Sequence, residues 1–421
     1  MRTPTSPACC DGSASALSRR NLLRAAALTG GMTTFGTAVV TTAPASLGAS
    51  SASAPSVVVV LSLRGAADGL SLVVPHSDPV YYKARPTIAI PKSSLLAADA
   101  TFGLHPGMAP LLQMWTSGRL AAVHATGLRV PNRSHFAAME EVEDADPGSA
   151  ARVGWLNRVL GDVSSGSPAQ ALSVGTPAAP GSLYGPEPVM AVAELSQVQV
   201  TGAEAGSDPH GTRRRSLGTV WAAESTPLGS GVRSALAASV DLLPALDVPD
   251  GAAGFPTSDL GKALASVSRV IRADTGTSLI TVDDGDWDHH ADLGIVTYGR
   301  MLNNTTDLAT SIAAFFADLG PFADKVTLVT ISEFGRRVKE NASRGLDHGW
   351  GNVMFLAGAG VKGGRYYGRW PGLDRGEDAD LKVTTDYRSV LAEVVASRTG
   401  ASIPTVFPGL KRERVGVMLG Q

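Results

Sequence analysis

Two short segments carry the residues best suited to bind a metal ion. Asp288 and His290 are separated by one residue, and His348 directly follows Asp347. An Asp-x-His pattern in a loop can direct a carboxylate oxygen and an imidazole nitrogen to one ion. This mixture of ligands suits Zn, Mn or Fe, whereas Mg and Ca prefer oxygen alone. The sequence therefore predicts a site for one or two divalent ions, with zinc and manganese as the first choices.

The other histidines differ in their surroundings. His289 adjoins His290, and because adjacent histidines usually divide into one inward and one solvated side chain, we favour His290 as the ligand. His124 ends an expected strand near the site, and its role stays open. Three histidines have no acidic companion and are expected to be surface or capping residues: His76, His105 and His210.

Further polar residues could complete the site. Asp68 precedes a glycine and Glu333 follows an apolar run, and both are candidate metal ligands. Ser134 stands where a helix should begin, and the positive end of the helix dipole there favours an alkoxide nucleophile and an incoming anion. A metal bound to the Ser134 oxygen would lower its pKa further. Arg133 or Arg336 could then clamp the oxygens of that anion.

Each of these residues also has a simpler interpretation. Asp68 before Gly69 would form a turn, and Ser134 would only cap the helix. Glu333 would pair with Arg336 or Arg337 as an ordinary ion pair. The functional interpretation gains weight because these residues follow several different strands.

Five short runs are almost entirely apolar, as expected of strands buried on both faces of a parallel sheet. Helical patterns separate the runs, which predicts an α/β fold: a three-layer sandwich with a mostly parallel central sheet. Ligands of such sheets bind at the carboxyl ends of the strands. The expected strands are 57–63, 120–124, 278–282, 326–331 and 353–356.

The helical pattern is clearest in four places and weakest in the middle of the chain. Segment 168–256 is rich in Pro, Gly and Ser, and we interpret it as a loop-rich insertion or cap. Its three consecutive arginines, 213–215, are expected to lie in a solvated loop. The expected helices are 107–117, 135–144, 295–319 and 387–397.

The N-terminus has the features of a twin-arginine export signal. Arg19 and Arg20 precede a mildly apolar run, 25–42, that is too short and too rich in Gly and Thr for a stable membrane anchor. Residues 43–45 and 52–54 are candidate cleavage sites, so residues 1–54 are expected to be signal and linker and 55–421 the mature domain. We expect the twin-arginine translocase as a partner during export, and an extracellular, periplasmic or cell-wall location.

Composition excludes several classes of function. The net charge of −2 gives no field that would attract nucleic acid or an anionic membrane. Both cysteines, Cys9 and Cys10, lie in the signal, so the mature protein has no disulfide, thiol chemistry or cysteine-based zinc site. The expected partner is instead an anionic ester, either a small molecule or part of a polymer.

Six blocks of the sequence resemble the bacterial domain of unknown function 1501 family, whose members look like relatives of the alkaline phosphatase and sulfatase superfamily. The resemblance implies an alkaline phosphatase-like sheet with a metal site at its carboxyl edge, Asp68 and Asp347-His348 as ligand candidates, and Ser134 where a metal-bound nucleophile could stand. The blocks are 63–70, 132–136, 154–156, 286–290, 332–336 and 347–351.

Two departures from the family pattern bear on the site. Asp286 and His289 replace a glycine and a threonine of the usual Gly-Gly-Phe/Trp-Asp-Thr-His motif, and they could add ligands or disturb the usual set. Glu333 stands near where many superfamily members have Asp-His, which implies that a second metal position is altered or absent.

The sequence thus favours an exported metal-dependent hydrolase of a phosphate or sulfate ester. The alternative is a non-catalytic secreted protein that keeps the fold as a scaffold for a partner or for surface carbohydrate. A glycan hydrolase that uses two carboxylates alone is a weaker hypothesis, because it leaves the histidines without a role.

Overall fold

The computed structural model describes residues 32–35, 38–41, 53–198, 208, 210–249, 251 and 254–420. The twin-arginine segment, 18–24, lies outside these residues. Two short strands, β1 (Met32–Phe35) and β2 (Ala38–Thr41), come from the apolar run that follows it. The export signal therefore stays a prediction from the sequence.

A large sheet with a parallel centre forms the middle layer. Its strand order is β1-β2-β8-β7-β9-β3-β10-β11-β6-β12, and β13 pairs with β6. Strands β8, β7, β9, β3 and β10 run parallel to one another, whereas β11 runs antiparallel to both β10 and β6. Strands β3, β9, β10 and β6 therefore share a direction, and their carboxyl ends lie at one edge. Bounds are β3 (Val57–Leu63), β6 (Leu120–Gly127), β7 (Ala171–Val174), β8 (Met190–Val192), β9 (Leu279–Asp284), β10 (Val326–Ile331), β11 (Asn352–Gly358), β12 (Arg365–Tyr367) and β13 (Thr385–Asp386).

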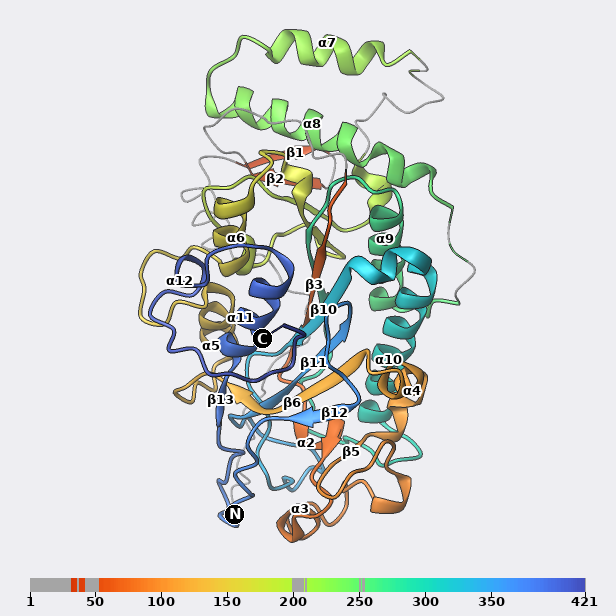
Figure 1. Ribbon diagram of the computed structural model, residues 1–421, viewed down its shortest axis with the longest axis vertical. Helices are drawn as coiled ribbons and strands as arrows, with labels where there is room; N and C mark the ends of the chain where they lie inside the picture. The colour runs from red at the N-terminus through yellow and green to blue at the C-terminus, as the bar shows by residue number, and fades with distance from the viewer. Residues whose placement is uncertain are drawn as a thin grey trace, which may run out of the picture.

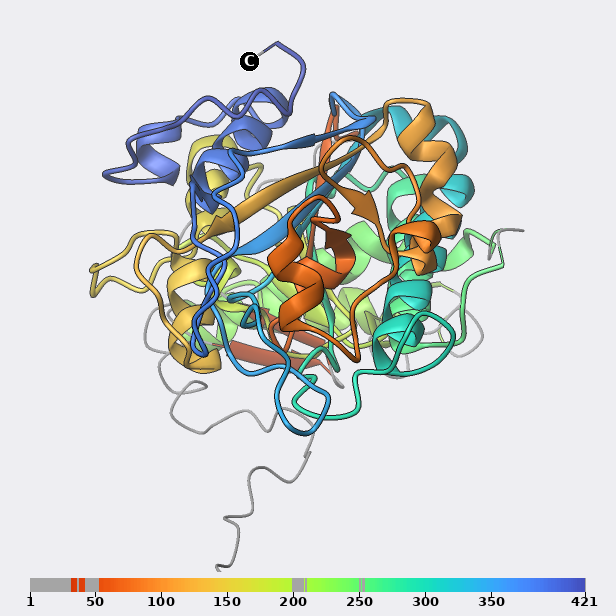
Figure 2. The same ribbon diagram turned by 90° about the horizontal axis from the view of Figure 1, so that it is seen from below.

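Helices cover both faces of this sheet, so the predicted three-layer α/β fold is confirmed (Figures 1 and 2). All of β3 is buried, and its side chains alternate between two cores, with Val59 and Leu61 in one and Val58 and Val60 in the other. Each such side chain contributes about 1.5–3 kcal/mol on burial. The first core includes α9 (Asp259–Arg272) and α10 (Arg300–Leu319), and the second includes α5 (His135–Asp144), α6 (Trp155–Val163) and α11 (Tyr387–Arg398).

Helix α10 begins five residues later than its sequence pattern predicts, at Arg300 rather than 295. Gly294 and Gly299 have φ angles of +92° and +116°, and a Cβ added to Gly294 would lie 2.4 Å from the Gly299 Cα atom. Only glycines allow this close approach, which closes a tight loop with a bridge between Ile295 and Tyr298. The apolar residues of this loop imitate the start of a helix in the sequence.

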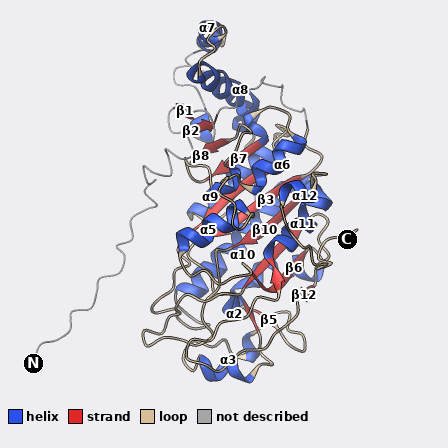
Figure 3. Cartoon of the chain, turned by 90° about the vertical axis from the view of Figure 1, so that its left-hand side faces the viewer, coloured by secondary structure: helices blue, strands red, loops and turns tan. Residues whose placement is uncertain are grey.

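Segment 168–256, predicted to be an insertion or cap, contributes to two parts of the fold. Strands β7 and β8 belong to the central sheet. Helices α7 (Thr212–Trp221) and α8 (Pro227–Asp247) lie beyond the β1–β2 end of that sheet (Figures 1 and 3). The three arginines lie in the first turn of α7 rather than in a loop, and Arg213 and Arg215 are exposed as expected.

Short elements complete the described fold. A second, two-stranded sheet pairs β4 (Val73–Val74) with β5 (Gly103–Leu104). Among the described residues, no helix combines the length and apolarity needed to cross a membrane. The remaining elements are α2 (Gly69–Leu72), α3 (Pro79–Ala84), η1 (Lys92–Ser94), η2 (Pro106–Leu111), α4 (Leu112–Thr116), η3 (Pro168–Gln170), η4 (Gly181–Leu183), η5 (Leu195–Val198), η6 (Gly320–Lys325) and α12 (Ile403–Val406).

Candidate metal centre

Loops at the carboxyl edge of the sheet bring distant residues together. His135 is the first residue of α5, which follows β6. Asp288 and His290 follow β9, and His348 lies in the connection between β10 and β11. His135 and His348 are 213 positions apart in sequence but in contact in space. The fold therefore assembles the cluster at the edge where ligands of parallel sheets bind.

The ligand atoms of His135, Asp288 and His348 all lie within 4.8 Å of one another, the only such group of three found among the described residues. The Nε2 atoms of the two imidazoles are 2.9 Å apart, and each lies 3.7 Å from Asp288 Oδ1. His290 Nε2 joins the group at 2.9 Å from His348 Nε2 and 3.0 Å from Asp288 Oδ1. His290 thus adjoins two members of the group, and the group of three mutually close ligand atoms consists of His135, Asp288 and His348.

Outer hydrogen bonds orient two of these rings. His135 Nδ1 lies 2.7 Å from Glu333 Oε1, and His348 Nδ1 lies 2.9 Å from the Arg133 carbonyl oxygen. Both acceptors take the Nδ1 proton, so Nε2 is the nitrogen of each ring that faces the cluster. Metal-binding histidines almost always make this kind of outer contact.

Glu333 is itself held in place. The backbone N–H of Gly65 donates to its Oε1 atom at 2.9 Å, and Ser332 Oγ donates to its Oε2 atom at 3.2 Å. The same hydroxyl hydrogen is shared with the Leu63 carbonyl, 2.9 Å from Ser332 Oγ, and so connects the end of β10 to the end of β3. Glu333, predicted as a ligand, thus lies behind His135 as its hydrogen-bond partner.

The donor set fits a zinc-like ion. Two imidazole nitrogens bound to one tetrahedral zinc at about 2.0–2.1 Å would lie roughly 3.3 Å apart. The 2.9 Å spacing between the Nε2 atoms of His135 and His348 needs only a small opening of the cluster to reach this value. Imidazole and carboxylate ligands together also match the preferences of zinc and manganese.

Charges in the cluster favour an ionised carboxylate. Although burial opposes ionisation, hydrogen bonds from His135, His348 and Arg336 hold the pKa of Asp288 far below its usual range. Burial also opposes a charge on His135, but Asp288 and Glu333 outweigh it and raise the pKa of His135 to about 9. The cluster is therefore an environment that stabilises positive charge.

Arg336 connects the cluster to the protein. Its guanidinium is fully buried and donates to Asp288 Oδ1 at 2.6 Å. Its other contacts are with the carbonyl oxygens of Gly65, Ala66 and Leu346 and with the ring of His290. Since its N–H groups are all engaged, Arg336 positions Asp288 and has no free donor for the anion-clamping role that the sequence predicts.

Asp68 and Asp347 lie outside the group of ligand atoms. Asp68 is 1% exposed and forms a bidentate ion pair with Arg85, at 2.5 and 3.0 Å. Despite its burial, Arg85 lowers the pKa of Asp68. Asp347 is half-exposed, 3.6 Å from His290 Nδ1, and accepts a hydrogen bond from Asn341. Asp68 therefore belongs to a structural ion pair, and Asp347 makes only a long contact with His290.

Ser134 and Arg133 border the cluster. Ser134 is exposed and occupies the N-cap of α5, but its hydroxyl makes no capping hydrogen bond. Arg133 is exposed, and its guanidinium pairs with Asp380 while its carbonyl holds His348. Both residues therefore directly precede the ligand His135 in the chain, and their side chains have access to solvent.

The other histidines are mostly buried. His105 is buried and caps η2 by accepting from Gly107 N–H, which confirms the capping expectation. His76 is 7% exposed, so the surface expectation is wrong for it. His124 stacks on Phe102 with both ring nitrogens unpaired, and burial lowers its pKa to about 3. Of the adjacent pair, His289 is the inward ring, and His290 is the one at the cluster.

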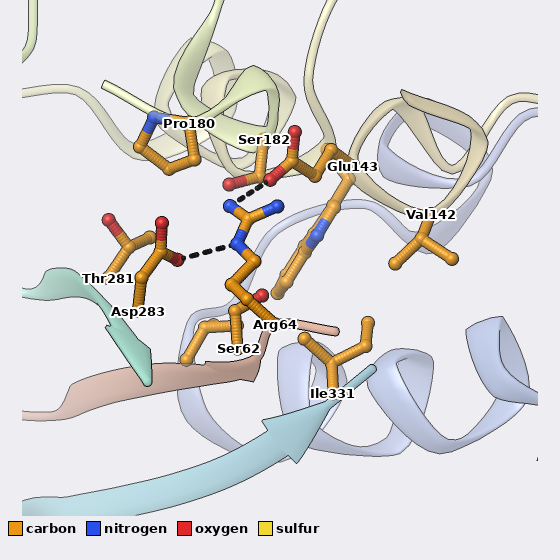
Figure 4. Close-up of a pocket in the computed structure, with 11 residues that line it drawn as sticks. Ser62, Arg64, Val142, Glu143, Pro180, Ser182, Thr281, Asp283 and Ile331 are labelled. Atoms are coloured by element: carbon orange, nitrogen blue, oxygen red, sulfur yellow. Dashed lines mark hydrogen bonds and ion pairs between the residues drawn. The ribbon is translucent and has the colours of Figure 1, made fainter. Parts of the chain in front are cut away.

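A small pocket lies further along the same edge, at the ends of β3 and β9 (Figure 4). Arg64 crosses it and pairs with Glu143 at 2.6 Å and with Asp283 at 3.0 Å. These carboxylates raise the pKa of Arg64 although its burial opposes the charge. Because two acids already bind this arginine, the pocket is not an open anion site.

The sequence reasoning missed His135, which is central to the cluster. Its position directly after Ser134, at the start of a helix that follows a strand, was available as a signal. In the sequence, this position favours Ser134 as the functional residue and does not mark His135. No acidic neighbour marks His135 in the sequence, because its partner Glu333 lies 198 positions away.

Comparison with known proteins defines the family. The family model for "Protein of unknown function (DUF1501)" matches residues 55–389, and the chain belongs to this family. No curated protein matches the chain. The expected family membership is therefore confirmed.

Solved structures give a distant likeness. The C-terminal periplasmic domain of EcEptC from Escherichia coli is 10% identical, with 87% of this chain and 92% of that chain covered and a TM-score of 0.36. The PsFucS1 sulfatase from Pseudoalteromonas sp. is 11% identical, with 74% and 64% covered and a TM-score of 0.31. Similarity at this level does not define an activity.

Proposed function

We propose that the protein is an exported metal-dependent hydrolase of a phosphate or sulfate ester. The observation that carries the proposal is the convergence of His135, Asp288 and His348, with two rings oriented from behind. A cluster of this kind at the carboxyl edge of an α/β sheet is where a catalytic ion is expected. The resemblance to the alkaline phosphatase and sulfatase superfamily supports the choice of ester.

His135, Asp288 and His348 would hold one divalent ion, zinc or manganese, and three protein ligands would leave a position open to the ester. Such an ion supplies positive charge that stabilises negative charge on the ester oxygens. Glu333 and the Arg133 carbonyl keep the Nε2 atoms of His135 and His348 directed inward. Arg336 fixes the position of Asp288.

Ser134 is the proposed nucleophile. Its hydroxyl stands at the N-cap of α5 beside His135, free of any capping bond and exposed to an incoming ester. The helix N-terminus favours negative charge on this oxygen. Its attack on phosphorus or sulfur would displace the alcohol, and water would then release the phosphate or sulfate. Arg133, exposed beside it, would contact the oxygens of the anion after exchanging its bond to Asp380.

The location follows from the N-terminus. We infer export by the twin-arginine route, with the translocase as a transient partner and the mature protein outside the cytoplasm. The substrate is then an extracellular, periplasmic or wall-borne anionic ester, and nucleic acid is not expected as a partner. Gel analysis of cell fractions, with Arg19 and Arg20 replaced by Lys, tests this, and unchanged export of that variant would contradict it.

Metal content is the first test of the proposed function. The mature protein, purified without added metal salts, is expected to contain about one equivalent of metal by elemental analysis. The double variant Asp288→Ala, His348→Ala should lose it. Asp292→Ala, which removes a nearby exposed acid paired with Arg344, is the matched control and should keep it. A wild-type protein that contains no metal and is not stabilised by Zn or Mn contradicts the proposal.

Activity is the second test. A panel of phosphate and sulfate esters should include at least one substrate of the metal-loaded protein, and Ser134→Ala should abolish its hydrolysis while the metal content stays unchanged. Retained hydrolysis in Ser134→Ala would contradict the role of the serine but not that of the metal centre.

A second candidate function is a non-catalytic scaffold. One observation favours it: His290 Nε2 lies 2.9 Å from His348 Nε2 and 3.0 Å from Asp288 Oδ1, and if it also bound the ion, four protein ligands would leave a tetrahedral ion no open position. A metal-containing protein inert to the whole panel would support this alternative. Activity that appears on substituting His290→Ala would instead show that this ring closes an otherwise catalytic site.

A further inference from the structure

One side of the candidate metal centre carries an unusually exposed aromatic residue. The Phe136 side chain directly follows His135 and is 84% exposed, more than any other large hydrophobic residue described. The residues of α5 that face the sheet are mostly apolar and buried, and include Ala138, Met139 and Val142. Folding of the helix therefore does not use Phe136, and its apolar surface is available to a ligand.

Helix geometry places Phe136 on the ligand side of α5. Phe136 and Glu143 are seven residues apart, which puts them on the same flank of the helix. Glu143 accepts hydrogen bonds from Arg64, at the end of β3 (Figure 4), and from the backbone N–H of Gly181. That flank faces β3 and β9, and the loop with Asp288 follows β9. Phe136 therefore lies on this flank of the helix, open to solvent and next in the chain to the candidate ligand His135.

The loop after His290 carries more exposed apolar surface. Tyr298 is 63% exposed and Ile295 is 37% exposed, and both belong to the tight loop that Gly294 and Gly299 close. Eight large hydrophobic residues are exposed among those described, and four of them lie in these segments. The four are Val130, Phe136, Ile295 and Tyr298. Apolar surface is thus concentrated in the segments that carry the candidate ligands.

We propose that Phe136 binds an apolar alkyl or aryl group of the substrate next to its ester bond. This inference rests on the proposed function and names the substrate class: an amphipathic ester whose anionic end meets the His135–Asp288–His348 cluster and whose apolar end covers Phe136. Burial of the phenyl ring on binding removes apolar area from water and favours such esters over wholly polar ones. Tyr298 extends the apolar surface on the other loop.

Binding of phosphonates to the zinc-loaded protein tests the proposal without requiring turnover. Calorimetric titration compares methylphosphonate, phenylphosphonate and octylphosphonate, the last below its micelle concentration. We expect the apolar phosphonates to bind at least tenfold more tightly than methylphosphonate. Phe136→Ser should remove most of this gain and Phe136→Leu only part of it. Leu419→Ser, at another exposed apolar site near the C-terminus, should retain the gain.

The outcomes separate this inference from the proposed function. Equal affinity for all three phosphonates, or a gain that survives Phe136→Ser, overturns the role of Phe136 while the ester site stands. No binding of any phosphonate to the zinc-loaded protein contradicts the proposed function itself. A preference for the phenyl over the octyl compound, lost in Phe136→Ser, supports the proposal and identifies the group as aryl.

Discussion

Asp68 and Asp288 are both candidate ligands in the sequence, but their surroundings in the fold are opposite. Asp68 is buried, and Arg85 satisfies both of its oxygens. Asp288 is half-exposed, and its Oδ1 atom faces three imidazoles as well as Arg336. An acid with a complete set of partners stabilises a fold, whereas an acid beside imidazole lone pairs can bind a cation. The partners, and not the residue type, separate the two roles.

The largest expected effect concerns the buried pair. Asp68→Ala should lower the free energy of unfolding by about 3–5 kcal/mol, because it leaves the charge of Arg85 buried and unpaired. Arg85 also donates to Ser71 and to the carbonyls of Arg337 and Val338, so these contacts would lose their anchor. Urea denaturation of the metal-free protein measures the change.

The same measurement on Asp288→Ala sharpens the comparison. Its expected loss of stability is smaller than that of Asp68→Ala, since solvent reaches Asp288, while only Asp288→Ala should abolish metal binding. If Asp68→Ala were as stable as the wild type and lost its metal, the roles assigned to the two acids would be reversed.

The next effect concerns the residue behind His135. Glu333→Ala should lower zinc affinity about 10–100-fold, because the ring of His135 loses the acceptor that orients it. Glu333→Gln keeps an oxygen for the His135 and Gly65 N–H groups and should restore part of that affinity. Competition with a zinc chelator measures both. Equal affinity in all three proteins would show that Glu333 does not act through His135.

Much of the fold is predictable from the sequence, because apolar runs such as 57–63 and 326–331 are unambiguous. These two runs coincide with β3 and β10, and helix 135–144 coincides with α5. Strand β11 runs antiparallel to β10, and the sequence does not predict this direction. A strand buried on both faces has the same apolar pattern in either orientation. The candidate site is less predictable, because Glu333 and His135 meet only through the fold. Likewise, nothing near Asp68 in the sequence marks Arg85 as its partner.

The comparison extends to the imidazoles, since His124 is buried without any polar partner and His135 is surrounded by acids. The folded pKa of His124, about 3, lies below its ordinary value of 6.5. Its neutral form therefore contributes stability above pH 6.5, and this contribution is lost as the pH falls toward 3. His124→Phe, which keeps an aromatic ring beside Phe102 and Trp370, should remove that loss.

Between pH 7 and pH 5 the wild type should lose about 2 kcal/mol of unfolding free energy that His124→Phe keeps. Urea denaturation at both values measures the difference, with His210→Phe at an exposed position as the control. The same pH dependence in wild type and His124→Phe would show that His124 is protonated in the folded protein.

The smallest effect is expected at Asp347, which the sequence ranks beside Asp288. Its carboxylate lies 3.6 Å from His290 Nδ1 and is half-exposed, whereas the Glu333 carboxylate lies 2.7 Å from His135 Nδ1 and is buried. Exposed pairs of this kind contribute about 0–1 kcal/mol, so Asp347→Asn should lower zinc affinity by less than about fivefold. The same chelator competition measures it. A loss as large as that of Glu333→Ala would mean that Asp347 moves onto the ion when it binds, and would return this acid to the set of ligands from which its greater distance separates it.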